Sequence, residues 1–269
     1  KYDIGDIVGI TGLTFVTHMG EKSIRVKSMV LLTKSLQPLP EKFHGLKDMD
    51  LRYRQRYVDL IVNPEVKSVF ITRAKIIKAI REYMSNLGYL EVETPVLHNQ
   101  ATNANARPFC THQNTLDIDM YLRIELELNL KKLIVGGLDK IFEIGKVFRN
   151  EGMDRTHNPE FTILEFYTAY KDYFWMMETT EQLLEKAAMD VCGSTEVPVG
   201  DKTISFKAPF KRISIFDAIQ EHTGFDVSRM NEEQLRSVCK QLHLHVDNTM
   251  GKGKLIDMIF GEKCEKTYV

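Results

Sequence analysis

Apolar and polar residues alternate along the first part of the chain with the two-residue period of a β-strand. Over residues 24–32, one set of positions that includes Ile24 and Val26 alternates with a set that begins at Arg25 and Lys27. Glycines around this stretch supply turns. Because about 35 residues are too few for a closed β domain, we predict that this segment is the tail of a small β-barrel.

The next periodic stretch has the spacing of a helix. From Val66 to Leu87 apolar residues recur on one helical face, and Gly88 occupies the place of a left-handed C-cap. An alternating, strand-like stretch over residues 89–95 follows and ends at Pro95. A proline can end a strand at a sheet edge or an interface but not inside a ladder, so we expect Pro95 at such an edge.

A pair of predicted strands around a polar loop carries the most information. Residues 140–144 predict the first strand, residues 152–159 the loop and residues 160–167 the second strand. Farther along, residues 176–189 have helical periodicity. Residues 212–269 predict mostly helical structure.

Side chains alternate between the two faces of a strand, which places Phe161, Glu165 and Tyr167 on one face of the second strand. By the same parity Arg149 and Glu151 share a face at the end of the first strand. If the strands form an antiparallel hairpin, these residues can line one concave surface that holds an anion, a cation and a flat ring. The pattern equally fits an edge sheet in which Arg149 and Glu165 form a cross-strand salt bridge.

The composition is that of an ordinary globular protein. The chain has 269 residues, 43% of them hydrophobic, and a formal net charge of -1, which excludes an intrinsically disordered chain. No stretch approaches the roughly 18 apolar residues of a membrane helix. Any contact with nucleic acid must come from a local patch, such as the arginines and tyrosines of residues 52–57. We favour a solvated helix face there, with the tyrosines packed underneath.

Cysteine spacing and the first residues bear on the cellular context. The four cysteines lie far apart, which excludes a zinc ribbon or a redox dithiol and indicates the reducing cytoplasm. The chain begins at Lys1 rather than at a methionine and continues directly into strand-like sequence. We therefore expect that it is a piece of a longer protein.

Several short stretches match a known family. Residues 148–152 are FRNEG, residues 156–162 are THNPEFT and residues 165–167 are EFY, which together resemble motif 2 of class II aminoacyl-tRNA synthetases in its lysyl form. Residues 88–95, GYLEVETP, resemble motif 1 of the same family. Residues 52–60, RYRQRYVDL, resemble the lysyl segment ahead of motif 1, and the resemblance extends over essentially the whole chain.

The resemblance implies an α+β fold, with a class II antiparallel sheet flanked by helices and preceded by the end of an OB-type β-barrel. The implied domains are the C-terminal part of an OB-fold anticodon-binding domain at residues 1–36, a linker at 37–62 and a partial catalytic domain at 63–269. Within the last, the expected segments are motif 1 at about 66–97, motif 2 at about 141–170 and a helical insertion at about 212–269. Motif 3, with the family's magnesium-binding glutamates, is missing, so we expect no metal ligand within this chain.

The implied activity is ligation of lysine to tRNA(Lys) during translation: ATP activates L-lysine to lysyl-adenylate, and the lysyl group then passes to the tRNA. The resemblance implies ATP and Mg²⁺ as cosubstrate and cofactor. It also implies a cytoplasmic homodimer formed through motif 1 around Pro95, without membrane attachment. We expect the 269-residue chain alone to be inactive.

The resemblance assigns roles to individual residues. Arg149 is the implied catalytic residue, which grips the α-phosphate of ATP and the substrate carboxylate. The implied ATP-binding residues are Arg149, Glu151, His157, Asn158 and Phe161, and the ring of Phe161 would stack on adenine. The implied lysine-binding residues are Glu127, Glu165, Tyr167 and Asn103. Arg107 is expected to be structural.

The sequence departs from the family pattern at two places near the lysine subsite. Thr102 and Asn103 stand where the family has two glycines, which let the backbone approach the substrate. Glu125 and Leu126 precede Glu127 where the family has Ala-Pro or Ala-Asn. Glu125 adds a carboxylate, which we expect to point to solvent at the first helical turn, where acids are favoured.

Two other functions remain open at this level. A related transferase attaches lysine to a translation factor, but it lacks the front barrel, so the strand-like residues 1–35 argue against it. A non-catalytic paralogue that binds ATP or tRNA is the other alternative, and the departures at Thr102, Asn103 and Glu125 motivate it.

Overall fold

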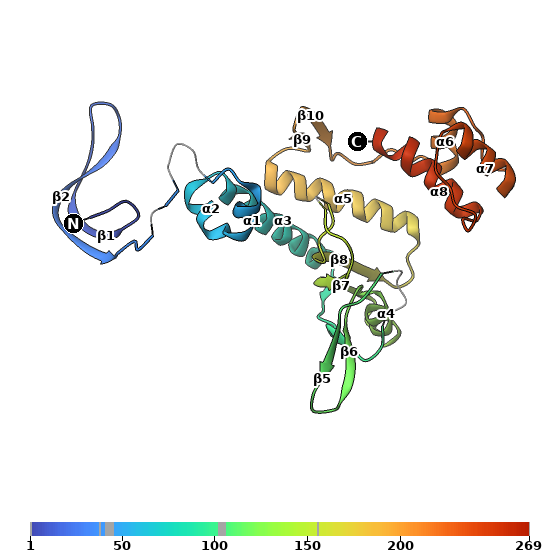
Figure 1. Cartoon of the computed structure of the whole chain (residues 1–269), viewed down its shortest axis with the longest axis horizontal. Helices are drawn as coiled ribbons and strands as arrows, with labels where there is room; N and C mark the ends of the chain where they lie inside the picture. Colours follow the sequence, from blue (N-terminus) through green and yellow to red (C-terminus); the bar gives the residue numbers. More distant parts are fainter. Residues whose placement is uncertain (1, 38, 41–45, 102–105, 155, 269) are drawn as a thin grey trace. The chain divides into compact units, whose positions relative to one another are not determined.

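The computed structural model divides the chain into two compact units, Lys1–Ile77 and Lys78–Val269 (Figure 1). The structure describes residues 2–37, 39–40, 46–101, 106–154 and 156–268. No helix in these ranges is both long and apolar enough to cross a membrane.

The first unit begins with an antiparallel hairpin of β1 (Ile7–Val16) and β2 (Lys22–Thr33). The strand predicted over residues 24–32 lies within β2. Apolar side chains such as Val30 and Leu32, which are 60% and 63% exposed, remain uncovered. Because two strands cannot enclose a core, the hairpin fits the end of a barrel, and the barrel itself stays a prediction.

Two short helices follow, α1 (Met49–Arg54) and α2 (Arg56–Val62). The carboxylate of Asp59 is fully buried and accepts hydrogen bonds from Arg52 Nε at 2.8 Å and Asn63 Nδ2 at 2.7 Å, and it also pairs with Arg56. A buried carboxylate requires such partners, so the arginines turn toward it.

This arrangement corrects our expectation for residues 52–57. Tyr53 and Tyr57 are 66% and 69% exposed, so the tyrosines are not packed underneath. Arg52 and Arg56 point inward instead, because Asp59 draws them there, whereas Arg54 is exposed and pairs with Asp50. The guanidinium of Arg56 also stacks on Tyr53.

Helix α3 (Val66–Asn86) crosses the boundary between the units and ends before Gly88, whose φ is +80°. This confirms the predicted helix and its left-handed glycine. The strand after it, β3 (Leu90–Glu91), is shorter than the predicted strand over residues 89–95. The prediction is wrong beyond Val92 because Thr94 bonds the side chain of Glu143 instead of continuing the ladder.

The second unit is built on a three-stranded sheet in the order β3-β7-β8. β7 (Lys140–Phe148) and β8 (Glu160–Thr168) form the expected antiparallel hairpin, and β3 runs parallel to β7. The two faces of this sheet pack against different helices, α4 (Glu127–Val135) and α5 (Tyr173–Cys192).

The sheet faces follow the predicted alternation. On one face Ile141, Val147, Phe161, Ile163 and Tyr167 pack against Leu126 and Leu130 at α4. The other face packs against Met84 of α3, Tyr89 just after this helix and Trp175 of α5. Its side chains are those of Phe142, Ile144, Leu164 and Phe166. The face toward α4 is therefore the one that carries the predicted site residues.

The remaining elements surround this sheet or form the C-terminal part. A smaller antiparallel sheet contains β4 (Leu97–His98), β5 (Cys110–Gln113) and β6 (Ile118–Leu122), and a separate hairpin contains β9 (Glu196–Val199) and β10 (Lys202–Ser205). The predicted helical C-terminal part contains α6 (Ile215–Thr223), α7 (Glu232–Gln241), α8 (Lys252–Lys263) and the short 3-10 helix η1 (Glu265–Thr267). These helices enclose a core of their own around Ile219, Leu235 and Ile259.

Candidate functional site

A hollow of about 310 Å³ lies at the end of the β7–β8 hairpin. Its lining consists of Arg149, Glu151, Gly152, Thr156, His157, Asn158, Pro159 and Phe161. All five residues to which the sequence assigns a nucleotide contact are among them. The structure therefore brings the whole predicted ATP set to one surface.

Arg149 is held at this hollow by its neighbours. Its guanidinium carbon lies 5.2 Å from the centre of the Phe161 ring. Its backbone N–H donates to Pro159 O at 2.8 Å, and its Nε donates to Ile124 O at 3.4 Å. Within the described ranges neither Nη atom has a protein acceptor, so most donors of the guanidinium fork are available to an anion.

The alternative of a cross-strand salt bridge between Arg149 and Glu165 is wrong. Among the residues that the structure describes, no ion pair joins these two side chains. Glu165 lies opposite Glu143 in the hairpin register, five residues along the strand from the end where Arg149 follows β7. It takes its hydrogen bonds from Leu126 N and Tyr167 instead.

The loop over the hollow is organised by Asp154. Its carboxylate accepts hydrogen bonds from Thr156 N at 2.7 Å and His157 N at 2.8 Å, and it contacts His157 Nδ1 at 2.9 Å. The backbone N–H of Thr156 and the side chain of His157 hold the pKa of Asp154 well below its usual range. Because the carboxylate engages Nδ1, the Nε2 edge of His157 is left for a ligand.

Glu151 and Asn158 are anchored by the backbone around them. Arg107 N donates to Glu151 Oε1 at 3.4 Å, and Asn150 N donates to Arg107 O at 2.7 Å. Asn158 Nδ2 donates to Glu160 O at 2.6 Å. Arg107 thus supports the loop through its main chain, as expected for a structural residue.

An acidic group lies on the same sheet face, next to the start of α4. Leu126 N donates to Glu165 Oε1 at 3.3 Å, and Tyr167 OH donates to Glu165 Oε2 at 3.2 Å. Burial, followed by the nearby charge of Glu165, raises the pKa of Tyr167, so its hydroxyl stays a donor. Glu127 pairs with Lys131 one turn along α4.

Glu125 belongs to this acidic group, which corrects our expectation that it points to solvent. Burial and the charges of Glu127 and Glu165 raise the pKa of its carboxyl. The residue is half-buried, so its carboxyl does not point freely into solvent. Asn103, the fourth predicted lysine-binding residue, lies outside the described residues, as does Thr102.

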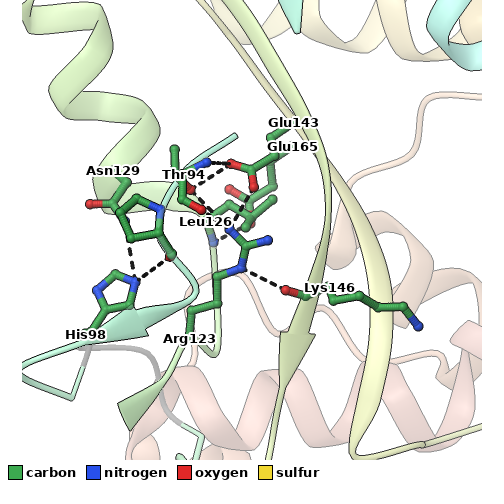
Figure 2. Close-up of polar contacts among 9 residues, drawn as sticks. Thr94, His98, Arg123, Leu126, Asn129, Glu143, Lys146 and Glu165 are labelled. Atoms are coloured by element: carbon green, nitrogen blue, oxygen red, sulfur yellow. Dashed lines mark hydrogen bonds and ion pairs between the residues drawn. The ribbon is translucent and has the colours of Figure 1, made fainter. Parts of the chain in front are cut away.

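Sequence reasoning missed a buried ion pair on the same sheet face as the site. Figure 2 shows Arg123 between Glu143, Thr94 and the Lys146 carbonyl. The side chains of Arg123 and Glu143 are 5% and 3% exposed, and Nη1 lies 2.7 Å from Oε1. Glu143 shares a strand face with the buried residues Ile141 and Val147. A carboxylate between two core positions requires a buried cation as a partner, so this alternation could have indicated the ion pair.

Comparison with known proteins identifies the family to which this arrangement belongs. A family model described as "tRNA synthetases class II (D, K and N)" matches residues 48–250, more than half of the chain. The chain belongs to this family. The family assignment agrees with the antiparallel hairpin and its flanking helices.

Individual relatives narrow the resemblance to one branch of this family. The chain is 56% identical over 274 residues to a lysine–tRNA ligase of Porphyromonas gingivalis, covering 99% of this chain and 47% of the relative. It is 57% identical over 265 residues to a lysine–tRNA ligase of Thermoanaerobacter pseudethanolicus, covering 98% of this chain and 53% of the relative. The chain thus spans about half the length of the curated relatives it matches.

Proposed function

We propose that the protein is a lysine–tRNA ligase that activates lysine with ATP and transfers the lysyl group to tRNA(Lys). The observation that carries this proposal is the convergence of Arg149 and Phe161 on one hollow, next to an acidic group on the same sheet face. An anion site, a planar ring surface and a cation site are what ATP and lysine together require. The lysine–tRNA ligases among the relatives support the same choice.

In the activation step the lysine carboxylate attacks the α-phosphorus of ATP, forming an acyl–phosphate bond as the bond to pyrophosphate breaks. Negative charge accumulates on the α-phosphate oxygens in the transition state. Arg149 neutralises that charge with the N–H donors that no described protein group occupies. Phe161 carries the adenine ring, and Glu151, His157 and Asn158 contact the nucleotide from the loop.

Lysine binds at the acidic group, where its α-ammonium meets Glu165 and Glu127. Tyr167 holds the Glu165 carboxylate in place by its hydrogen bond of 3.2 Å. Asn103 is the fourth proposed contact. The negative charge of this group attracts the α-ammonium, which every amino acid carries, so we assign it amino-acid binding and not the choice of lysine.

The family also implies magnesium with ATP. Among the described residues no three His, Cys, Asp or Glu side chains form a group that could hold a metal ion. Because Mg²⁺ that accompanies ATP is held mainly by phosphates and water with one or two carboxylates, we propose that it enters with ATP, and the roles assigned above are those of protein groups alone.

The remaining assignments rest on the family. We propose a homodimer formed through motif 1 near Pro95, a cytoplasmic location, and an anticodon-binding barrel of which residues 1–36 are the end. The linker at 37–62 and the catalytic segments from residue 63 onward belong to the same proposal.

The test is lysine-dependent exchange of pyrophosphate into ATP, measured on the full-length gene product. Arg149→Ala should lower the exchange rate by about two to three orders of magnitude, because the transition-state charge loses its donor. Arg229→Ala, at an exposed arginine ahead of α7, is the matched control and should leave the rate unchanged. Absence of lysine-dependent exchange in the unmodified protein, or an unchanged rate in R149A, would contradict the proposal. A comparison of lysyl transfer to tRNA with lysyl transfer to a protein acceptor then decides between the ligase and the transferase that acts on a translation factor.

A further inference from the structure

The buried pair of Arg123 and Glu143 is the largest polar feature of the second unit to which the proposed chemistry gives no role. Arg123 Nη1 donates to Glu143 Oε1 at 2.7 Å and to Thr94 O at 2.9 Å, and Arg123 Nε donates to Lys146 O at 2.8 Å. Thr94 Oγ1 donates to the other carboxylate oxygen of Glu143 at 2.7 Å. Both carboxylate oxygens of Glu143 and two of the three guanidinium nitrogens of Arg123 thus have partners, which favours one geometry for the buried pair.

The same network connects the end of motif 1 to the start of α4. Thr94 binds both members of the pair, and Pro95 O, next in sequence, contacts His98 Nε2 at 3.0 Å. Asn129 of α4 in turn contacts His98 at 3.5 Å (Figure 2). His98 Nε2 cannot donate to Pro95 O and accept from Asn129 Nδ2 at the same time, so the bonds of Thr94 to Arg123 and Glu143 are the ones that hold this segment.

From Arg123 the chain passes directly through the proposed active site. Arg123 N donates to Val96 O, and Phe148 N donates to Arg123 O, both at 2.9 Å, so its main chain is held from two sides. The next carbonyl, of Ile124, accepts from Arg149 Nε at 3.4 Å. Two residues farther, Leu126 N donates to Glu165 Oε1 at 3.3 Å. One short segment, residues 123–126, thus touches both the phosphate-binding and the lysine-binding side chains.

We propose that Arg123, Glu143 and Thr94 form a positioning unit, which holds residues 123–126 so that Ile124 O orients Arg149 and Leu126 N–H orients Glu165. The role of this unit in catalysis rests on the proposed function, whereas its effect on the position of residues 123–126 does not. None of the three side chains has to touch a substrate. Because the segment reaches both subsites, its displacement would misalign Arg149 and lysine together, and small displacements of reacting groups are costly.

A purely structural pair predicts different behaviour. Losing a bond in a structural pair lowers the stability of the fold but leaves the kinetic constants of the folded molecules unchanged. Losing a bond in a positioning unit changes the mobility of residues 123–126 and the lysine constants, even where stability is matched.

Two threonine variants separate these cases. Thr94→Val removes the hydroxyl that binds Glu143 at 2.7 Å and leaves the main-chain bonds of Thr94 in place. Thr168→Val removes a hydroxyl contact with Tyr89 at the far end of β8. Within the described part of the chain, neither Thr168 nor Tyr89 has a hydrogen bond to residues 123–126. Both threonines are partly buried and both variants are isosteric, so the loss of one short hydroxyl bond is matched, and T94V also loses the longer contact of Thr94 Oγ1 with Arg123 Nη1 at 3.2 Å.

The first measurement is hydrogen–deuterium exchange of the peptide covering residues 123–130. In T94V the exchange of this peptide should be faster by about three- to tenfold, as expected for the loss of one hydrogen bond, and in T168V it should be unchanged. Equal hydrogen–deuterium exchange of this peptide in the two variants, or no acceleration in T94V, would overturn the positioning unit, independently of the activity of the protein.

The second measurement is the exchange of pyrophosphate on the full-length gene product. In T94V the ratio kcat/KM for lysine should fall by roughly tenfold relative to T168V at equal Tm. A conservative variant, Thr94→Ser, keeps the hydroxyl and should restore both readouts. If the peptide is loosened in T94V while the unmodified protein lacks lysine-dependent exchange, the proposed function fails and the positioning unit stands. If the unmodified protein is active and T94V and T168V have the same kcat/KM for lysine, the pair of Arg123 and Glu143 is structural only.

Discussion

The guanidinium carbon of Arg149 lies 5.2 Å from the centre of the Phe161 ring, at the wall of the hollow at the end of the β7–β8 hairpin. The two residues come from opposite ends of the loop that follows β7. A charged group over an aromatic face is stabilised by about 0.5–1 kcal/mol at a partly exposed site. The contact orders the arginine before any anion binds, so less side-chain entropy is lost on binding.

Replacing Phe161 should weaken ATP binding without affecting lysine binding. Phe161→Leu keeps an apolar side chain but removes the flat face for adenine, and the KM for ATP should rise by roughly tenfold, the usual effect of losing one base–aromatic stack. Pyrophosphate exchange at varied ATP and varied lysine measures the two constants. Phe174→Leu, at a 56% exposed phenylalanine of α5, is the control and should change neither. An unchanged KM for ATP in F161L would remove Phe161 from the nucleotide site.

The hairpin and its two faces could be predicted from the sequence because they depend on local information. Strand alternation placed Phe161, Glu165 and Tyr167 on one face, and this is confirmed by the register with β7 and by the two separate cores. Convergence of Arg149 with Phe161 also followed, since antiparallel pairing places the residue after β7 beside the start of β8.

Features that depend on distant partners could not be predicted in this way. Arg123 and Glu143 are 20 residues apart, and Thr94 lies 49 residues from Glu143, so no periodicity connects them. The short length of β3 follows from the same contact, because Glu143 takes the N–H of Thr94. The inward direction of Arg52 and Arg56 could not be predicted because it depends on Asp59, whose charge becomes buried only in the folded structure.

Asp154 should matter for ATP through the shape of its loop. Asp154→Ala removes the acceptor of Thr156 N and His157 N, so the KM for ATP should rise by about three- to tenfold while the KM for lysine stays constant. Asp119→Ala, which removes a similar exposed contact with His112 at 3.0 Å in the β5–β6 hairpin, is the matched control. Equal constants in the two variants would contradict a role for the loop.

The low pKa of Asp154 also predicts the pH range of this effect. The folded-state pKa lies below the ordinary value of 3.8, so the stabilisation is fully present above that value and is lost only as the pH falls through the lowered pKa. Titration of Asp154 therefore contributes nothing to the pH dependence of ATP binding near neutrality. A D154A effect that varies with pH in the neutral range would have to come from another group.

Glu125 should reduce the stability of the unliganded protein at neutral pH. Burial and the charges of Glu127 and Glu165 raise its pKa above the ordinary value of 4.5, although Arg149 and Lys131 oppose the shift. Its ionisation is thus disfavoured in the fold, and the associated stability is present below the ordinary value and lost as the pH rises through the raised pKa. Glu125→Gln should therefore be more stable than the unmodified protein at pH 7 by no more than about 1 kcal/mol, because the carboxyl is still partly in solvent.

Thermal unfolding at several pH values checks this, and the gain should disappear as the pH falls to the ordinary value of 4.5. The control is Glu233→Gln in the first turn of α7, where loss of the acid should destabilise the protein by about 0.3–1 kcal/mol through the helix dipole. Added lysine should stabilise the unmodified protein more than E125Q, because the extra carboxylate attracts the cation. Equal stabilisation by lysine would show that Glu125 is outside the lysine subsite.

Gly145 should be the most sensitive glycine of the sheet, because a side chain there would collide with the buried pair. A Cβ at this position would lie 2.5 Å from Arg123 Nη2 and 3.0 Å from Glu143 Oε1. The guanidinium cannot move away without losing its bonds to Thr94 O and Lys146 O. Gly145→Ala should therefore lower the free energy of unfolding by about 1–3 kcal/mol. Gly253→Ala, inside α8 with open space around it, should raise this free energy by about 0.5–1 kcal/mol through helix propensity. Urea denaturation of both variants gives the two values, and a stable G145A would mean that the ion pair is free to shift.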